Sequence, residues 1–508
     1  MSNLVICCDG TWNTPDQREH GIPAPTNVVR IYNAIDDIDE QGGKQNKYYH
    51  PGVGTDGNWW EKLLGGGAGE GLDKNIMSAY QRLCYNFDLK NDDQIFLFGF
   101  SRGAYTVRSL SGFITRCGLL EIKDLPPAVV WERIEYLLQC YRGKKDPRKD
   151  RKSKGWKYHN ALGQDIKIRF IGVWDTVGAL GIPDDMALLN LLDSRKDYTF
   201  HDTTLNKSVL TARHAIAMDE LRATFQPTLW TDYDVAQDVK QVWFPGVHAD
   251  VGGGYRECGL ADGALKWMIE EAARCGLRFD DEMLKQIKPN YNDTMHDSCN
   301  GVFAMLPTQP RSIPILSDRV QLHSSAISRH KTPPISQCPY RRTLDVQPAS
   351  FATLDISARN PWNETGLWLE QGVTYRFSAS GEWMDASIAC GPGGTDDGKF
   401  HPGETVQLLA SALGKIETAF KSLSGNNSAE FQFTKRHEAF QWFSLIGCIA
   451  NSKGVDDKAQ LIPPETFLIG EGCQYTPKRS GYFYAYANDA WNCYGNNRGN
   501  VALTIERT

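Results

Sequence analysis

The sequence has no excess of basic residues, no long apolar run and no pair of cysteines with C-x-x-C spacing. It has 55 lysines and arginines and 61 acidic residues, for a formal net charge of -6. Nucleic-acid-binding proteins, by contrast, need a basic surface. Nucleic acid is therefore not an expected partner. No stretch approaches the roughly 18 apolar residues of a membrane-spanning helix. The 13 cysteines, an odd number spread along the chain, do not suggest a small disulfide-bonded framework.

The N-terminal segment, MSNLVICCDGTWN, has neither the basic start nor the long apolar centre of a signal peptide. Together with the cysteine usage, this favours synthesis in the reducing cytoplasm. If the protein is exported, we expect a route that needs no cleaved signal peptide, such as a contact-dependent secretion system.

Short β-rich runs alternate with helical patterns from the N-terminus to about residue 280. This alternation predicts an α/β-hydrolase-like fold, in which helices flank a mostly parallel sheet. In such sheets the ligand site lies beyond the carboxyl ends of the strands. The predicted strands are LVICCDG, KYYHPGVG, QIFLFGF, IKIRFIGVW and VKQVWFPGVHA. The predicted helices are TNVVRIYNAIDDI, NIMSAYQRLCYNF, GAYTVRSLSGFITRCG, NKSVLTARHAIAMDELR and ADGALKWMIEEAARCG.

The pattern of the sequence changes near residues 330–350, where prolines gather and periodicity fails. We predict a first domain over residues 1–335, a linker over 336–350 and a second domain over 351–508. The second domain has aromatic and glycine-rich runs separated by turn residues, which predicts an antiparallel β-sandwich. These runs are GVTYRFSASGEW, FQWFSLIGCIA, SGYFYAYAND and GNVALTIER.

One serine lies between two glycines where a buried strand is predicted to become a helix, in the stretch QIFLFGFSRGAYTV. The pentapeptide GFSRG fits the G-x-S-x-G pattern of a nucleophile elbow, in which Gly99 and Gly103 relieve crowding around the serine. Ser101 is therefore the candidate nucleophile, and a plain turn serine is the other interpretation. A serine hydroxyl is a weak nucleophile at neutral pH, so it needs a base and a group that orients the base.

Two further residues at predicted strand ends supply the remaining members of such a triad. Asp175, at the end of the apolar strand in IRFIGVWDTVGA, is the candidate acid, and His248 in VWFPGVHADVGGGY is the candidate base. The chain order Ser101, Asp175, His248 is the Ser, Asp, His order of α/β hydrolases. Asp250 competes for the acid role, and His323 competes for the base role.

Ester hydrolysis by a serine also needs backbone N–H donors for the oxyanion, one of them normally from the residue after the nucleophile. That residue is Arg102. The second donor normally comes from an early strand-to-helix loop, and CDGTWN lies where such a loop is expected. We therefore expect the second donor near Thr11, with Asp9 bracing the loop.

Six stretches spaced through the first domain form a recognisable set. They are CDGTWN, GVGT, IFLFGFSRGAYTVRSL, GVWDTVGA, RHAIAMDELRATFQP and WFPGVHADVGGGY. Over these stretches the first 330 residues or so resemble the bacterial α/β-hydrolase family that includes type VI secretion phospholipase effectors of the first Tle class. The resemblance implies a serine lipase fold that releases fatty acids from phospholipids. It also implies that Ser101, Asp175 and His248 form the triad, without a cofactor.

The segment YANDAWNCYGNNRGNVALTIE resembles the metal loop of the soluble calcium-dependent galactophilic lectins of bacteria. By that resemblance Asp489, Asn496 and Asn497 are side-chain ligands of Ca2+, and Cys493 offers its carbonyl oxygen. Calcium is a hard cation that takes such oxygen ligands. The lectins also contact sugar through a histidine, for which ACGPGGTDDGKFHPGE offers His401. His401, Asp489 and Asn496 form the expected carbohydrate site, although the glutamine of the lectins has no counterpart.

Together these features predict a serine-dependent lipolytic hydrolase of the phospholipase A type, fused to a calcium-dependent carbohydrate-binding-like module. The expected partners are a phospholipid or another acyl ester as substrate, a glycan or glycolipid, and a component of a secretion machine. Such a protein would act as a secreted antibacterial or anti-host effector. Two alternatives stay open: an esterase that acts on acylated carbohydrate, and a non-catalytic glycan-binding protein on a hydrolase scaffold.

Overall fold

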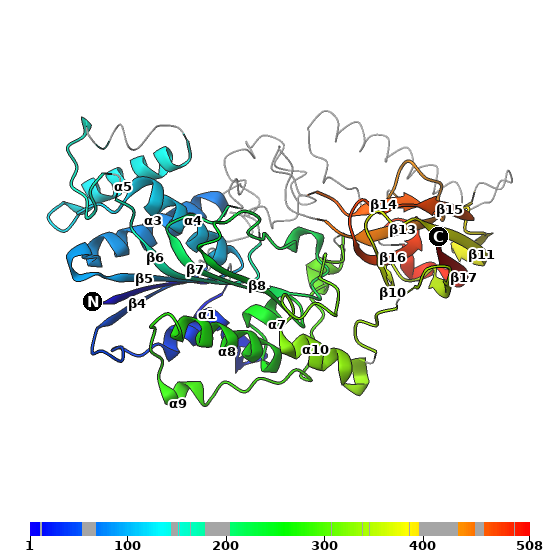
Figure 1. Ribbon diagram of the computed structural model, residues 1–508, viewed down its shortest axis with the longest axis horizontal. Coiled ribbons are helices and arrows are strands. Elements are labelled where there is room, and N and C mark those ends of the chain that lie inside the picture. Colours follow the sequence, from blue (N-terminus) through cyan, green and yellow to red (C-terminus); the bar gives the residue numbers. More distant parts are fainter. Residues whose placement is uncertain are drawn as a thin grey trace.

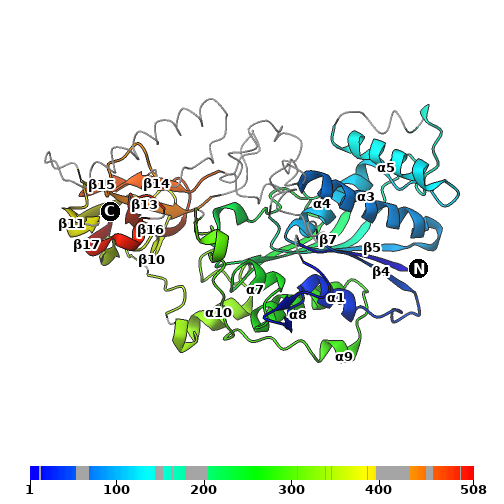
Figure 2. The same cartoon turned by 180° about the vertical axis from the view of Figure 1, so that it is seen from behind.

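The computed structural model shows a helix-flanked sheet in the N-terminal half of the chain and a β-rich C-terminal half (Figure 1). The C-terminal sheets lie at the end of the molecule opposite to the chain's N-terminus, as both views show (Figures 1 and 2). The structure describes residues 1–10, 13–52, 68–143, 151, 153–162, 164–177, 204–305, 307–337, 339–344, 346–385, 387–395, 435–452, 462–491 and 493–508.

A parallel sheet with the strand order β4-β1-β5-β6-β7-β8 forms the centre of the N-terminal half. Its strands are β1 (Asn3–Cys8), β4 (Gln45–His50), β5 (Gln94–Phe100), β6 (Ile168–Trp174), β7 (Val209–Ala217) and β8 (Asp238–Phe244). A short hairpin, β2 (Arg18–Glu19) and β3 (Ile22–Pro23), follows β1. The helices are α1 (Asn27–Ala34), α3 (Ala68–Asn86), α4 (Arg102–Cys117), α5 (Pro127–Tyr141), α7 (His248–Gly252), α8 (Gly259–Ala273), α9 (Asp281–Leu284) and α10 (Ser324–Lys331).

Both faces of the parallel sheet are buried under helices. Successive residues of a strand point to opposite faces, so Ile95 and Leu97 of β5 pack with α3, α4 and α5, whereas Phe96 and Phe98 pack with α1 and α8. Near-continuous apolar runs such as QIFLFGF are what a strand buried on both faces requires. This arrangement confirms the predicted α/β-hydrolase-like fold class. None of the helices in the described ranges is long and apolar enough to cross a membrane.

Strand β7 corrects one prediction. The segment NKSVLTARHAIAMDELR was expected to form a helix, but residues Val209–Ala217 pair with β6 on one side and β8 on the other. Its leucine, alanine and arginine residues have high helix propensity. Because nearly every residue of the strand is buried, the sequence also lacks the alternation of a half-exposed strand. Pairing on both sides outweighs the local preference.

Two antiparallel sheets form the C-terminal half, as predicted. One has the order β10-β16-β13-β14, and the other has the order β12-β11-β17-β9, with β15 paired to β11. Their strands are β9 (Phe351–Ser357), β10 (Asn363–Leu369), β11 (Tyr375–Asp385), β12 (Ile388–Cys390), β13 (Leu445–Ala450), β14 (Glu465–Leu468), β15 (Gly472–Tyr475), β16 (Gly481–Ala487) and β17 (Arg498–Arg507). Side chains from both sheets form one core between them, including Trp383, Phe377 and Phe483.

Strand β16 belongs to two hydrophobic cores at once. Phe483 and Ala485 pack in the core of the C-terminal half, whereas the tyrosines of the strand pack against Ile313 and Leu316. These tyrosines are Tyr482, Tyr484 and Tyr486. Because Ile313 and Leu316 lie in the chain segment between α9 and α10, the two halves of the molecule share an apolar interface.

Candidate active site

The carboxyl ends of β5 and β6 bring Ser101 and Asp175 side by side. Phe100 and Trp174 are the last residues of these strands and are register partners. The backbone N–H of Ser101 donates to the carbonyl oxygen of Trp174 at 3.1 Å, and that of Asp175 donates to Ala215 of β7 at 2.7 Å. Both residues therefore leave the sheet at the same edge, where parallel α/β sheets carry their sites.

Ser101 has the backbone conformation of a sharp strand-to-helix turn, with φ 56° and ψ −122°. This is a strained conformation for a residue with a Cβ atom. A Cβ atom at Gly99 would overlap the backbone of Gly103, and one at Gly103 would overlap the carbonyl oxygens of Cys8 and Asp9. The two glycines thus allow β5, α4 and the end of β1 to meet around the serine.

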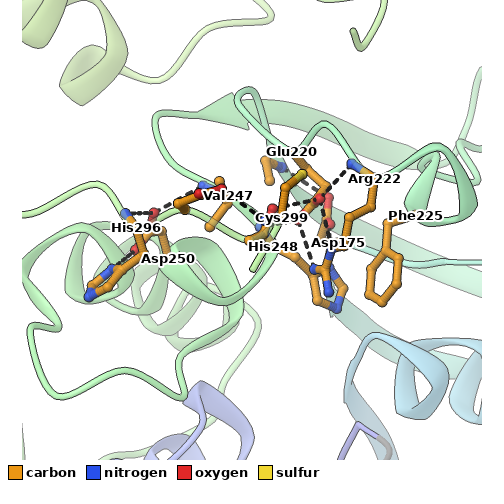
Figure 3. Close-up of polar contacts among 12 residues, drawn as sticks. Asp175, Glu220, Arg222, Phe225, Val247, His248, Asp250, His296 and Cys299 are labelled. Atoms are coloured by element: carbon orange, nitrogen blue, oxygen red, sulfur yellow. Dashed lines mark hydrogen bonds and ion pairs between the residues drawn. The ribbon is translucent and has the colours of Figure 1, made fainter. Parts of the chain in front are cut away.

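His248 and Asp175 form a buried pair. The Nδ1 atom of His248 lies 2.5 Å from the Oδ2 atom of Asp175 (Figure 3). The aspartate is fully buried, and its other oxygen accepts from the backbone N–H of Ala217 at 3.0 Å. Burial lowers the pKa of His248, and the hydrogen bond to Asp175 only partly opposes this. The imidazole is therefore neutral at neutral pH and can accept a proton.

Aromatic rings place the imidazole of His248 next to the elbow. The ring centroid of Phe100, the residue before Ser101, lies 4.6 Å from that of His248. The ring of Phe225 packs edge to face on the same imidazole, with 5.0 Å between the two centroids. Both Ser101 and His248 are buried. The structure therefore places His248 against Asp175 and against Phe100, the residue that precedes Ser101.

Arg311 also contacts Asp175, although no sequence pattern had indicated it as a site residue. Its Nη1 and Nη2 atoms donate to the two carboxylate oxygens at 2.6 and 2.9 Å. Burial would raise the pKa of Asp175, but Arg311 and His248 outweigh it and hold the pKa well below its usual range. The one signal in the sequence is a single charge in the otherwise uncharged stretch TQPRSIPIL.

Glu220 is a second buried partner that the sequence did not reveal. Its carboxylate accepts from the backbone N–H of His248 at 3.2 Å, from the Ser298 hydroxyl at 2.8 Å and from the Arg222 guanidinium. It thereby holds the first residue of α7 in place. Burial would raise the pKa of Glu220, but Arg222 lowers it to about 2.

The two competing residues have other contacts. Asp250 accepts from the Val247 backbone at 3.0 Å and pairs with Nδ1 of His296 at 2.6 Å, away from the Asp175–His248 pair (Figure 3). His323 stacks on Phe244 and caps α10. Within the described ranges, Asp175 is the aspartate that contacts the His248 ring.

The loop after β1 passes directly beside the serine. A Cβ atom at Gly10 would lie 3.1 Å from Cβ of Ser101. Asp9 braces this loop, because its carboxylate accepts from Gly10 N at 2.7 Å, from the Thr26 hydroxyl at 2.6 Å and from the Tyr49 hydroxyl at 2.8 Å. Burial raises the pKa of Asp9 to about 6.

Of the two candidate oxyanion donors, the structure describes Arg102 but not Thr11. Arg102 is the first residue of α4, and the N-terminal N–H groups of a helix carry partial positive charge that suits an oxyanion. The backbone at Gly10 and the backbone at Arg102 therefore both lie next to Ser101.

In the C-terminal half, the predicted calcium ligands gather around a buried carboxylate. Asp489 accepts from the Asn497 amide at 2.8 Å, and the Asn496 amide donates to Asp385 at 3.4 Å. The Oδ1 atom of Asn497 is buried without a hydrogen-bond partner. Burial, and then the nearby charge of Asp385, raise the pKa of Asp489 to about 7. Cys493 follows in the same loop, before the short helix Tyr494–Asn496.

This cluster fits a hard cation better than a transition metal. It offers two carboxylates and amide oxygens, which calcium prefers. Over the described stretches, no three His, Cys, Asp or Glu side chains gather as a metal site would require, so a cation here would depend on amide and carbonyl oxygens as well. Asp385 was not predicted, because it lies more than 100 residues earlier in the chain. His401 lies outside the described residues.

One known protein from yeast is similar in sequence to part of this chain. The chain is 30% identical over 258 residues to an uncharacterised protein of Saccharomyces cerevisiae. The matched region covers 45% of this chain and 33% of the yeast protein. The chain thus spans a third of the length of this relative.

Three solved structures are similar to this chain at low TM-scores. An uncharacterised protein from Pseudomonas aeruginosa has 19% identity and a TM-score of 0.32, over 57% of this chain and 49% of that one. A Tle1 effector bound to the VgrG spike of the type VI secretion system has 18% identity and a TM-score of 0.29, over 51% of each chain. The N-terminal domain of EclA, a PllA-like lectin, has 14% identity and a TM-score of 0.19, over 31% of this chain and 95% of that one.

A family model supports a firmer assignment. The model of the catalytic domain of Tle1-like phospholipase effectors of the type VI secretion system matches residues 2–271. This range is more than half of the 508 residues and contains Ser101, Asp175 and His248 with the strands that precede them. The chain therefore belongs to the Tle1-like phospholipase effector family of the type VI secretion system.

Proposed function

We propose that the protein is a serine-dependent lipolytic hydrolase of the phospholipase A type. The observation that carries this proposal is the buried His248–Asp175 pair, 2.5 Å apart, beside the strained turn at Ser101. A neutral imidazole held in one tautomer by a carboxylate is the base that a serine hydroxyl needs.

In the first half of the reaction, Ser101 Oγ attacks the ester carbonyl and Nε2 of His248 takes its proton. Asp175 keeps the other ring nitrogen protonated and stabilises the imidazolium. The N–H of Arg102 and the loop at Gly10 and Thr11 hold the oxyanion. The imidazolium then protonates the leaving alcohol, here a lysophospholipid.

In the second half of the reaction, a water molecule attacks the acyl-enzyme. Nε2 of His248 takes a proton from the water and then gives it to Ser101 Oγ, which leaves as the free hydroxyl when the fatty acid departs. This chemistry requires no metal at the triad. Membership in a phospholipase effector family supports phospholipid as the substrate and export by the type VI apparatus, whose components would be partners in transit.

The experiment that tests this function is fatty-acid release from mixed phospholipid vesicles by the parent protein and by Ser101→Ala. Release that disappears in the variant supports the proposal. Cleavage of short soluble esters that depends on Ser101, without release from vesicles, would favour an esterase on another acyl ester, such as acylated carbohydrate. If neither substrate is cleaved and a fluorophosphonate does not label Ser101, the hydrolase is rejected in favour of a glycan-binding protein.

A second function, calcium-dependent sugar binding by the C-terminal half, is favoured by one observation. The carboxylate of Asp489 is buried close to Asp385, and the amide oxygen of Asn497 is buried without a hydrogen-bond partner. Uncompensated buried oxygens are costly, and a calcium ion held by Asp489, Asn496, Asn497 and the carbonyl oxygen of Cys493 would compensate them. With His401, this site would hold a glycan or glycolipid and raise the enzyme concentration at a membrane.

A further inference from the structure

Arg311 is buried as completely as the carboxylate that it contacts. Its side chain is 0% exposed, as is that of Asp175. Beyond the two bonds to Asp175, Nη1 donates to the carbonyl oxygen of Ala217 at 2.7 Å, and Nη2 donates to that of Phe225. Because Phe225 also packs edge to face on His248, one guanidinium fixes the carboxylate and the backbone that supports the imidazole.

The segment that carries Arg311 is held on its other side by the C-terminal sheets. Gln309 donates to the hydroxyl of Ser452 at 3.2 Å. The backbone N–H of Leu316 donates to the Tyr482 hydroxyl at 3.0 Å, and Ile313 and Leu316 pack against the tyrosines of β16. A second bridge joins the indole N–H of Trp362 to the Thr308 hydroxyl at 2.9 Å. Residues 307–316 thus link the triad acid to the sandwich.

The charges around the pair make Arg311 the cation that matters to Asp175. Among the described residues, the charged and titratable groups that act on the pair or on the neighbouring His214 are Arg311, Glu220, Arg222, Arg108 and His214 itself. Glu220 and Arg222 pair with each other, as do Asp250 and His296. His214 accepts from the N–H of Thr176 and is neutral, because burial lowers its pKa to about 3.

We propose that Arg311 is a positioning residue for the Asp175–His248 pair, and that the C-terminal sandwich holds Arg311 in place, so that the sandwich is part of the catalytic framework. The proposal rests on the proposed hydrolase function. A bidentate guanidinium fixes the plane of a carboxylate, which a lysine does not. A cation bonded to both oxygens of the Asp175 carboxylate also weakens the attraction of that carboxylate for the imidazolium.

The first test compares the parent with Arg311→Met and Arg311→Lys. Selective histidine labelling and NMR titration give the pKa of His248, assigned with His248→Asn, and a short soluble ester gives kcat and KM against pH. In Arg311→Met we expect the pKa of His248 to rise by about one unit, with the acidic limb of kcat/KM moving the same way. The kcat should fall at least about tenfold, with KM little changed.

In Arg311→Lys we expect the pKa of His248 to stay near the parent value, because the positive charge remains. We expect kcat still to fall, because lysine cannot make the two parallel hydrogen bonds that the guanidinium donates to Asp175. A folded Arg311→Met with the parent's His248 pKa and with kcat within about twofold of the parent would overturn the proposal. If Arg311→Met does not fold, Arg311→Lys is the deciding variant. A kcat equal to that of the parent in Arg311→Lys would overturn a role that depends on the bidentate contact of the guanidinium with Asp175.

The second test removes two of the three hydrogen bonds described between the segment and the sandwich, with Gln309→Ala plus Tyr482→Phe. We expect kcat on the soluble ester to fall at least about threefold without a change in KM. The matched control is Thr353→Val, which removes the hydroxyl pair with Thr504 on β9 and β17, away from Arg311. Parent kcat in the double variant would overturn the role of the sandwich.

The NMR readout separates this proposal from the proposed function. If the parent cleaves no ester but the pKa of His248 shifts in Arg311→Met, the hydrolase is wrong and the coupling of Arg311 to the pair stands. If the parent is active and Arg311→Met changes neither the pKa of His248 nor kcat, the hydrolase stands and the positioning role is wrong.

Discussion

The Nδ1 atom of His248 lies 2.5 Å from Oδ2 of Asp175, although 73 residues separate them in the chain. The contact exists because β6 and β8 end at the same edge of a parallel sheet, with β7 between them. A fully buried carboxylate next to a buried imidazole has little purpose in stability alone, because burying both groups carries a desolvation cost. The arrangement supports the proposal that this pair transfers a proton.

Replacement of the two candidate aspartates should have unequal effects. Asp175→Asn is expected to lower kcat for a soluble ester by roughly 10³- to 10⁴-fold, because the amide cannot hold the imidazole in the required tautomer. Asp250→Asn, the matched control, should lower kcat less than about tenfold, since Asp250 bonds to Val247 and His296. Steady-state kinetics on both variants checks this. The opposite order would make Asp250 the triad acid.

Asp9→Asn should impair catalysis more than substrate binding. An amide at this position cannot accept from Gly10 N–H, Thr26 and Tyr49 together as the carboxylate does, so the loop beside Ser101 should loosen. We expect kcat to fall roughly 10- to 100-fold with KM little changed, the pattern of lost transition-state stabilisation.

The control for Asp9 is Asp39→Asn, because Asp39 braces a loop in the same way through Gln41 and Gly43, on the edge of the sheet at the start of β4. Its kcat should stay within about threefold of the parent. Equal losses in the two variants would show that Asp9 acts on stability rather than on the site.

Gly103→Ala should destabilise the fold. The added methyl would overlap the carbonyl oxygens of Cys8 and Asp9, so β1 and α4 must separate, at an expected cost of about 1–3 kcal/mol. Gly263→Ala in α8 is the control, because its methyl would meet nothing within 4 Å and alanine favours a helix by about 1 kcal/mol. Urea unfolding of both variants measures the difference. A neutral Gly103→Ala would mean that the elbow can relax.

Calcium should stabilise the C-terminal half more at pH 8 than at pH 6. The pKa of Asp489 is raised to about 7 without a cation, so its ionised form costs stability, and that cost grows as pH rises above the unfolded-state pKa toward 7. A bound cation needs the ionised form and reverses the effect. The measurement is Tm with calcium and with chelator at both pH values.

Two variants frame the calcium prediction. Asp489→Asn should remove the calcium-dependent rise in Tm. Asp355→Asn, which changes an exposed carboxylate on β9, should keep it. A chelator that leaves the Tm of the parent unchanged at pH 8 would argue against a calcium site.

Much of the candidate site was predictable because its parts are local. The run QIFLFGFSRG indicates a buried strand that turns sharply into a helix, since the apolar residues and the flanking glycines are neighbours in sequence. The same holds for Asp175 and His248, each of which follows an apolar strand. Strand β7 was missed because its residues favour a helix locally, and only its two paired neighbours determine its conformation.

The sequence by itself determined the fold class, the elbow at Ser101 and the order of the three candidate residues, because strand propensity, glycine spacing and chain order are properties of neighbouring residues. Only the tertiary structure decided that Asp175 contacts His248 while Asp250 pairs with His296. It also decided that Arg311 and Glu220 reach the site from distant segments. Contacts of this kind depend on which buried polar groups must satisfy one another after the sheet and the sandwich have packed, and no local pattern records that requirement.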